Sequence, residues 1–314
     1  MGEKRPIVEA KDLVVEYGKG SRKVRAVDGI SFNVTEGECV GFIGANGAGK
    51  STTIKTLMGF LFPVSGTVRM FGEDCGTVES RRRIGYLPEV ALYYPFMKAR
   101  ELLELYGGLQ GMTKHELRER IPELLNLVGL QGKGEILLRN FSKGMQQRLG
   151  IAQAIISHPE ALIFDELSSG LDPVGRHDLR RVLLDIKNSG KTIFFSSHEL
   201  TEVETLCDRV IMIHEGRIVT EAPVSDLMKP LNLFEIVFSM QDGNTLPESV
   251  ERLGPARDGN QYRLSINDVE LYSRVVHELS QAGAAIHSTS SKSRSLEEYF
   301  IELVKSSGNE EGAA

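Results

Sequence analysis

Over residues 1–225, short apolar runs alternate with stretches whose apolar positions recur at helical spacing. Short apolar runs bounded by polar or glycine residues predict strands. The predicted strands are Val8–Tyr17, Ile30–Val34, Cys39–Ile43, Gly66–Met70, Ala161–Phe164, Thr192–Ser196 and Arg209–His214. Because strands and helices alternate, we expect an α/β domain with a largely parallel sheet, and we place it at residues 1–228.

The pattern between residues 88 and 157 is helical, which predicts a helical subdomain inserted into the sheet domain. In the segment 113–129 the apolar residues recur at helical spacing, and Thr113 with Glu116 forms a capping box at its start. Pro122 lies inside this pattern, so it should kink the helix or divide it.

The pattern changes again near Pro230 and predicts a small α+β accessory domain at residues 229–306. Its predicted strands are Leu233–Met240, Gln261–Ile266 and Ala285–Ser290, and its predicted helices are Val269–Gln281 and Ser295–Val304. The polar, small-residue tail at 307–314 should be disordered.

Composition narrows the class of protein. Of 314 residues, 41% are apolar and 25% are charged, as in an ordinary globular protein. The net charge of −6 argues against nucleic acid as a partner. Cys39, Cys75 and Cys207 are too widely spaced for a disulfide framework or a metal cluster. With no signal-peptide core and no apolar run of about 18 residues, we expect a soluble cytoplasmic chain whose membrane role, if any, comes through a partner.

The segment Gly44–Ser51 reads G-x-x-x-x-G-K-S, between a predicted strand and a predicted helix. In such a loop, backbone N–H groups surround phosphates, a lysine adds positive charge and a serine hydroxyl binds Mg²⁺. A chance match is the competing interpretation, and the strand–loop–helix context argues against it. The residues expected to contact nucleotide are Gly44, Ala45, Asn46, Gly47, Ala48, Gly49, Lys50, Ser51 and Thr52.

Polar residues follow two of the later predicted strands. Asp165 and Glu166 directly follow an apolar strand, where Asp165 could hold Mg²⁺ and Glu166 could polarise an attacking water. The alternative is a pair of surface acids that end a strand. His198 follows the strand Thr192–Ser196 and should reach the same sheet edge, close to the γ-phosphate.

A second candidate anion site lies far from the first in sequence. Ser142 precedes a run that can form a helix, and Gly144 removes a side chain from its first turn. Helix N-termini bind anions because their first N–H groups have no internal partner. Two anion sites so far apart in one chain require an explanation.

Taken together, these motifs resemble those of the ATP-binding subunit of ABC transporters over residues 1–225. Gly44–Ser51 resembles the Walker A motif, Ile163–Glu166 the end of Walker B, Ser142–Gln146 the signature, Ser169–Asp172 the D-loop, and His198 the switch histidine. The resemblance implies an ABC-type P-loop NTPase fold, ATP and Mg²⁺ as cofactors, and an ATPase.

The resemblance also implies roles for individual residues. Glu166 and His198 would be catalytic, while Ser51, Asp165 and Glu89 would serve the metal. Ser142, Gly144, Gln146 and Asp172 would contact nucleotide, and Tyr17 would stack on adenine, although a core tyrosine at a strand end is a competing interpretation. Three positions depart from the commonest pattern: Glu89 replaces the Q-loop glutamine, Met145 a signature glycine and Leu167 a proline.

A narrower resemblance is to the ATPases of type-2 ABC exporters. It rests on Y-L-P-E at residues 86–89, on S-K-G-M-Q at 142–146 and on the accessory domain ending SLEEYFIELV. It implies a head-to-tail homodimer, in which each signature serves the partner's ATP, and a separate membrane permease that selects the cargo. The chain would then lie at the inner face of the cell membrane. The rivals are a soluble ABC ATPase acting on ribosomes or DNA, an importer ATPase, and a nucleotide-binding subunit without turnover.

Overall fold

The computed structural model describes residues 4–18, 23–228, 230–241, 244–293 and 296–300. The chain divides into two compact units, residues 1–224 and 225–314. The predicted tail at 307–314 and the end of the predicted helix at 295–304 lie outside the described residues, whereas residues 296–300 are helical.

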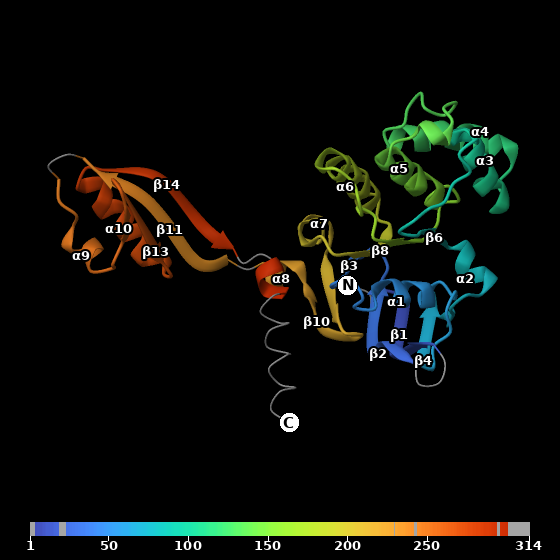
Figure 1. Cartoon of the computed structure of the whole chain (residues 1–314), viewed down its shortest axis with the longest axis horizontal. Coiled ribbons are helices and arrows are strands. Elements are labelled where there is room, and N and C mark those ends of the chain that lie inside the picture. The colour runs from blue at the N-terminus through green and yellow to red at the C-terminus, as the bar shows by residue number, and fades with distance from the viewer. Residues whose placement is uncertain (1–3, 19–22, 229, 242–243, 294–295, 301–314) are drawn as a thin grey trace. The chain divides into compact units, whose positions relative to one another are not determined.

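The first unit contains a six-stranded sheet in the order β10-β9-β3-β8-β7-β6 (Figure 1). Its strands are β3 (Cys39–Ile43), β6 (Ile84–Leu87), β7 (Ala161–Asp165), β8 (Thr192–Ser197), β9 (Arg209–His214) and β10 (Arg217–Pro223). The strands β9, β3, β8, β7 and β6 are parallel, and β10 pairs antiparallel at the edge. Every residue of β3, β7 and β8 is buried, as expected for a sheet covered on both faces.

A second sheet corrects the expectation of one largely parallel sheet. The strands β1 (Pro6–Tyr17), β2 (Val24–Thr35), β4 (Ser65–Met70) and β5 (Glu73–Asp74) form an antiparallel sheet in the order β2-β1-β4-β5. Three predicted strands therefore belong to this sheet. The helix α1 (Lys50–Leu57) contacts both sheets, and stacked rings of Phe32, Phe42 and Phe194 join β2, β3 and β8 in one core.

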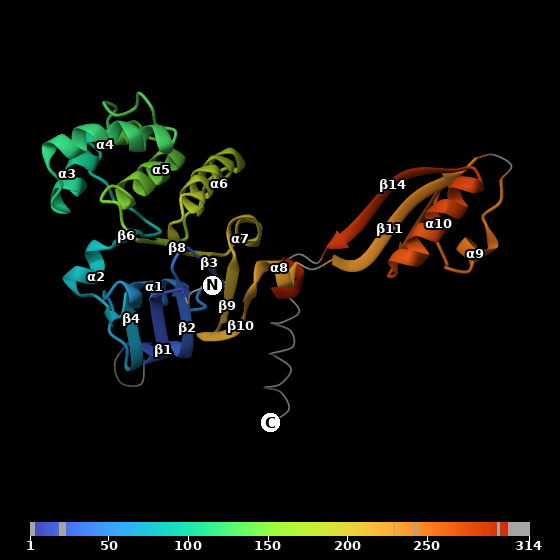
Figure 2. The ribbon, with the colours of Figure 1, turned by 180° about the vertical axis from the view of Figure 1, so that it is seen from behind.

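The helices α3 (Ala99–Leu109), α4 (Lys114–Leu127) and α5 (Lys143–Ala154) gather on the far side of the six-stranded sheet from the antiparallel sheet (Figures 1 and 2). The capping box of Thr113 and Glu116 is present at the start of α4. Of the two predicted outcomes at Pro122, a kink or a division, the division is wrong, because α4 is one helix that runs through Pro122. Its buried leucines and isoleucine hold both halves against α3 and α5, which outweighs the local cost of the proline.

The remaining helices of the first unit are α2 (Val78–Arg82), α6 (Pro173–Asn188) and α7 (Leu200–Leu206), and α8 (Val224–Leu227) lies at the boundary between the units. The second unit has its own antiparallel sheet in the order β12-β13-β11-β14. Its elements are β11 (Pro230–Met240), α9 (Glu248–Glu251), β12 (Ala256–Asp258), β13 (Gln261–Ile266), α10 (Val269–Gln281) and β14 (Ala284–Ser293). Phe238, Leu264 and Leu279 contribute to a separate core in this unit.

Candidate functional site

The glycine-rich loop between β3 and α1 folds closely against neighbouring backbone. A Cβ at Gly44 would lie 2.2 Å from the carbonyl oxygen of Ile213, and one at Gly49 would lie 2.5 Å from that of Ala26. Gly49 also has a φ of 112°, in the region that favours glycine. These two glycines let the loop turn directly into α1, which begins at Lys50.

The ammonium of Lys50 is buried inside this loop. Its Nζ donates to the carbonyl oxygens of Gly44 at 2.7 Å and Ala45 at 3.1 Å, and lies 3.0 Å from Oε1 of Glu166. Lys50 and Glu166 are only 5% and 6% exposed. The structure thus brings the loop lysine and the predicted base into direct contact.

The two acids at the end of β7 are joined by a residue that sequence reasoning did not single out. Ser196 Oγ donates to Asp165 Oδ1 at 2.7 Å and accepts from the backbone N–H of Glu166 at 3.0 Å. Ser51 Oγ donates to the same Asp165 oxygen at 3.1 Å. In the sequence, Ser196 could be noticed only as a hydroxyl residue at the end of a predicted strand, because its role depends on β8 lying beside β7.

Glu166 also contacts the predicted switch histidine. Its Oε2 lies 2.5 Å from Nδ1 of His198, whose side chain is 41% exposed. Glu166 has a φ of 50°, an unfavourable backbone conformation for a residue with a side chain. The strand end therefore holds Glu166 in a strained turn between a buried cation and a partly exposed imidazole.

These residues border a cleft of about 330 Å³. It is lined by Asn46, Gly47, Gly49, Lys50, Ser51, Thr52, Glu89, Glu166, Ser169 and His198. Ser169 is a further cleft residue that was matched only as part of the D-loop motif. Tyr17 OH donates to Thr52 Oγ1 at 3.1 Å, and Tyr17 is 39% exposed, so the competing interpretation as a core tyrosine is wrong.

The signature residues lie outside this cleft. Ser142 caps α5, and its Oγ accepts from the N–H of Met145 at 3.2 Å. Asp172 caps α6 in the same way, and accepts from the N–H of Gly175 at 2.8 Å. Gln146 lines a neighbouring hollow of about 370 Å³, which shares Glu89 and Ser169 with the cleft, and Gly144 lies in the first turn of α5. One chain therefore does not bring its own signature to its own phosphate loop.

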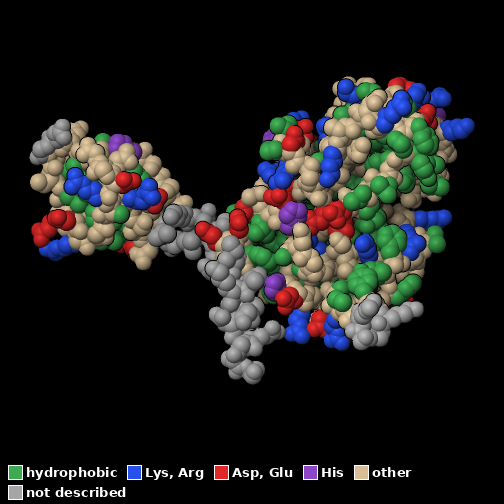
Figure 3. Space-filling view, viewed as in Figure 1, with side chains coloured by type: hydrophobic (Ala, Val, Ile, Leu, Met, Phe, Trp, Pro, Cys, Tyr) green, Lys and Arg blue, Asp and Glu red, His purple; other side chains and the backbone are tan. Residues whose placement is uncertain are grey.

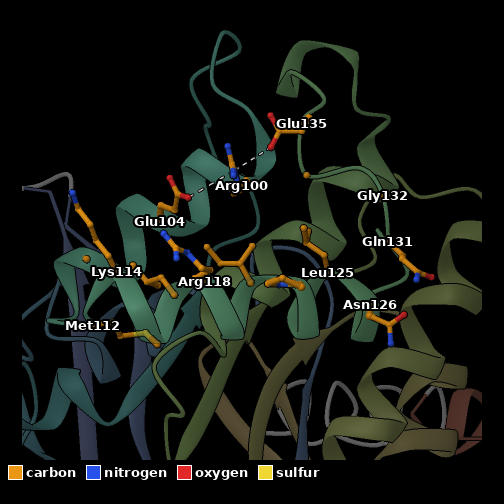
Figure 4. Close-up of a pocket in the computed structure, with 15 residues that line it drawn as sticks. Arg100, Glu104, Met112, Lys114, Arg118, Leu125, Asn126, Gln131, Gly132 and Glu135 are labelled. Atoms are coloured by element: carbon orange, nitrogen blue, oxygen red, sulfur yellow. Dashed lines mark ion pairs between the residues drawn. The ribbon is translucent and has the colours of Figure 1, made fainter.

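A larger groove, of about 980 Å³, lies between α3, α4 and the loop that follows them (Figure 4). Arg100 bridges Glu104 at 3.7 Å and Glu135 at 3.1 Å along its rim. None of the motif residues lines this groove, so the candidate chemistry lies in the smaller cleft.

The cleft of about 330 Å³ beside the phosphate loop suits a nucleoside triphosphate with a hard divalent cation. Glycines that exclude a Cβ leave backbone groups open to phosphates, and Ser51 and Asp165 place a hydroxyl and a carboxylate oxygen side by side. Oxygen ligands of this kind suit Mg²⁺, which binds through few protein groups and retains waters. Over the described residues no cluster of three or more His, Cys, Asp or Glu forms a metal cage.

The fold and this cleft define a P-loop ATPase. The model of the family described as ABC transporter matches residues 27–169. The bacitracin transport ATP-binding protein BcrA of Bacillus licheniformis is 36% identical over 95% of this chain and 97% of that protein. The Nod factor export ATP-binding protein I of Paraburkholderia xenovorans is 39% identical over 70% of this chain and 72% of that protein.

A solved ATP-binding subunit of an ABC transporter is 32% identical, with a TM-score of 0.62 over 71% of this chain and 92% of that one. The chain belongs to the ABC transporter ATP-binding family. It is an ATPase that hydrolyses ATP for transport, related to exporter ATPases, and the predicted fold class is confirmed. Within the described part of the chain, the helices are too short or too polar to cross a membrane.

Proposed function

We propose that Lys50, Glu166 and His198 form the hydrolytic centre of an ATPase subunit that drives export through a separate permease. The observation that carries this proposal is the pair of contacts made by one carboxylate. Glu166 touches Lys50 with one oxygen and His198 with the other, at 3.0 and 2.5 Å. Three residues far apart in sequence thereby meet at one edge of the parallel sheet.

Each residue then has a distinct task. The backbone of the loop from Gly44 to Thr52 and the Lys50 ammonium bind the phosphates of ATP. Glu166 accepts a proton from the attacking water as general base, and His198 fixes the Glu166 carboxylate on its other side. Tyr17 stacks on adenine, since its ring is partly exposed next to Thr52.

The metal ligands are Ser51 and Asp165. Their oxygens lie 3.1 Å apart, and Glu89 lines the same cleft, within reach of the metal or its waters. Bound Mg²⁺ would neutralise charge on the phosphates. Ser196 keeps Asp165 and Glu166 in register, because its hydroxyl bonds both residues.

The separate position of the signature supports a head-to-tail homodimer. Ser142 and Gly144 begin α5, whose free N–H groups favour an anion that their own chain does not supply. In a two-fold dimer, the partner's γ-phosphate would meet this helix end together with Gln146, and Asp172 would approach across the interface. ATP then holds the dimer closed, and hydrolysis releases it.

The permease partner is supported by exposed apolar side chains in the first unit. Leu92 is 88% exposed and Phe96 is 70% exposed, in the segment that joins Glu89 to α3. Figure 3 shows hydrophobic side chains grouped over the helical subdomain. Apolar patches of this kind mark interaction surfaces. We place the chain at the inner face of the membrane through this surface, and we propose export because a relative carries that activity in its name.

Mixed dimers test both the site and its arrangement. Ser142→Arg and Glu166→Gln subunits should each form inactive homodimers. A heterodimer of the two has one composite site with both parts intact, so ATP turnover should return. A heterodimer of Lys50→Ala and Glu166→Gln is the matched control, because each of its sites keeps one defect and it should stay inactive. If ATP turnover returned in neither mixed dimer, the proposal of a site shared between two subunits would be contradicted.

A further inference from the structure

Glu202 is a buried carboxylate that the proposed chemistry does not use. It lies on α7 and is 6% exposed. Its Oε2 accepts two hydrogen bonds, from Ser168 Oγ at 2.9 Å and from Ser197 Oγ at 3.3 Å. Burial raises the pKa of Glu202, and the two hydroxyls only partly offset that effect. A carboxylate in such a costly position calls for a reason.

The two serines belong to the two segments that carry the hydrolytic centre. Ser168 follows Glu166 by two residues, and Ser197 directly precedes His198. Both serines are almost fully buried, at 2% and 1% exposed. A single oxygen of Glu202 therefore joins the segment after β7 to the segment after β8.

A second bridge joins the same two segments. Arg176, near the start of α6, donates through Nη1 to Glu199 Oε1 at 2.6 Å and through Nε to the Leu171 carbonyl oxygen at 3.2 Å. Glu199 in turn follows His198, and its backbone N–H donates to Ser197 Oγ at 2.9 Å. The residues from 168 to 171 and from 197 to 199 are thus fastened to each other at both ends.

We infer that Glu202 is a positioning residue whose shared acceptor oxygen fixes the distance between Glu166 and His198. It also holds Ser169, which follows Ser168 and lines the cleft. Small displacements of a catalytic group lower rates steeply, so a rigid link between the two segments favours turnover. The inference rests on the proposed roles of Glu166 and His198.

The test separates the acceptor oxygen from the charge and from packing. In Glu202→Gln the amide keeps an oxygen that can accept both hydroxyls, so the full-length chain should retain kcat within about threefold. In Glu202→Met the volume remains but the acceptor is lost, so kcat should fall by about tenfold or more while KM for ATP changes by less than about twofold. A Glu202→Met enzyme with native kcat would overturn the inference.

A double-mutant cycle provides an independent readout should Glu202→Met fold poorly. If Ser168 and Glu202 act through one hydrogen bond, Ser168→Ala should cost much less kcat in the Glu202→Met background than in the native one. Purely additive losses would contradict the link. Glu38→Gln is the control, since Glu38 is a partly buried, ion-paired carboxylate outside the cleft, so its loss should affect thermal stability and not kcat of the folded enzyme. Native turnover in Glu166→Gln would contradict the proposed role of Glu166 as the base, and this result would not depend on Glu202.

Discussion

The ammonium of Lys50 lies 3.0 Å from the carboxylate of Glu166, and both groups are buried. Removing one partner of such a pair leaves an uncompensated charge away from water. The phosphates of ATP offer Lys50 an alternative partner. Binding of the triphosphate should therefore draw the lysine toward phosphate and release Glu166 to act on water.

Glu166→Gln should abolish hydrolysis and retain ATP binding. Loss of a general base costs about a hundredfold or more in rate. Without ATP, this variant should melt at a lower temperature than the native chain, because Lys50 loses its counter-charge. ATP should remove this difference, because its phosphates pair with Lys50 instead. Turnover, thermal melting with and without ATP, and the fraction of closed dimer in ATP are the measurements. Glu119→Gln on the exposed side of α4 is the control, and native turnover in Glu166→Gln would refute the base assignment.

Ser196→Ala should weaken the use of Mg²⁺. The change deletes one donor to Asp165 and the only acceptor identified for the N–H of Glu166 among the described contacts. An unpaired buried group costs about 1–3 kcal/mol, so thermal stability should also fall. The Mg²⁺ concentration for half-maximal turnover should rise, whereas Ser273→Ala in the second unit should leave it unchanged. If the Mg²⁺ dependence of turnover were unaltered, Ser196 would have no part in positioning the proposed metal ligand Asp165.

Tyr17 distinguishes ring stacking from hydrogen bonding. Tyr17→Ala should raise KM for ATP by about tenfold, in line with the free energy of stacking a base on an aromatic ring. Tyr17→Phe loses only the hydrogen bond to Thr52, so its KM should stay close to native. Equal effects of the two changes would show that the ring does not bind adenine.

Glu38 provides a stability prediction with a defined pH dependence. Burial alone would raise the pKa of Glu38, but the hydrogen bonds from Arg209 and Thr35 outweigh it and hold that pKa below its ordinary value of 4.5. A depressed folded-state pKa contributes stability above the ordinary pKa, and this contribution disappears as pH falls through the lowered value. Glu38→Gln should therefore melt below the native protein at neutral pH, and the two melting temperatures should converge in acid. A constant difference between pH 7 and about pH 3 would contradict this account.

The phosphate loop and the capped helices were predictable because their determinants are local. A glycine-rich turn, a following lysine and serine, and a capping residue act within a few positions of one another. Ser196 and Glu202 could not be predicted as site residues, because no local sequence motif marks them. A serine and a glutamate are common surface residues, and their roles here depend on β8 lying between β3 and β7.

The two sheets show the same division. Period and composition predicted most of the strands, but they did not show that β1 lies between β2, its neighbour in sequence, and the distant β4, in a sheet separate from the parallel one. Pro122 by itself favours an end to the helix, but the packing of α4 against α3 and α5 keeps the helix continuous. Propensity acts on neighbours in sequence, whereas strand pairing is chosen by burial across the whole unit.

The phosphate-binding loop and the residue types proposed for the chemistry could be predicted from the sequence alone, because they depend on short-range backbone geometry and on the chemical nature of side chains. The folded chain was needed to see that Lys50, Glu166 and His198 meet, that Ser196 joins the two acids, and that Ser142 and Gly144 on α5 lie outside the cleft of their own chain. Those relationships depend on the order of strands in a sheet, which is set by the burial of apolar surface from distant parts of the chain.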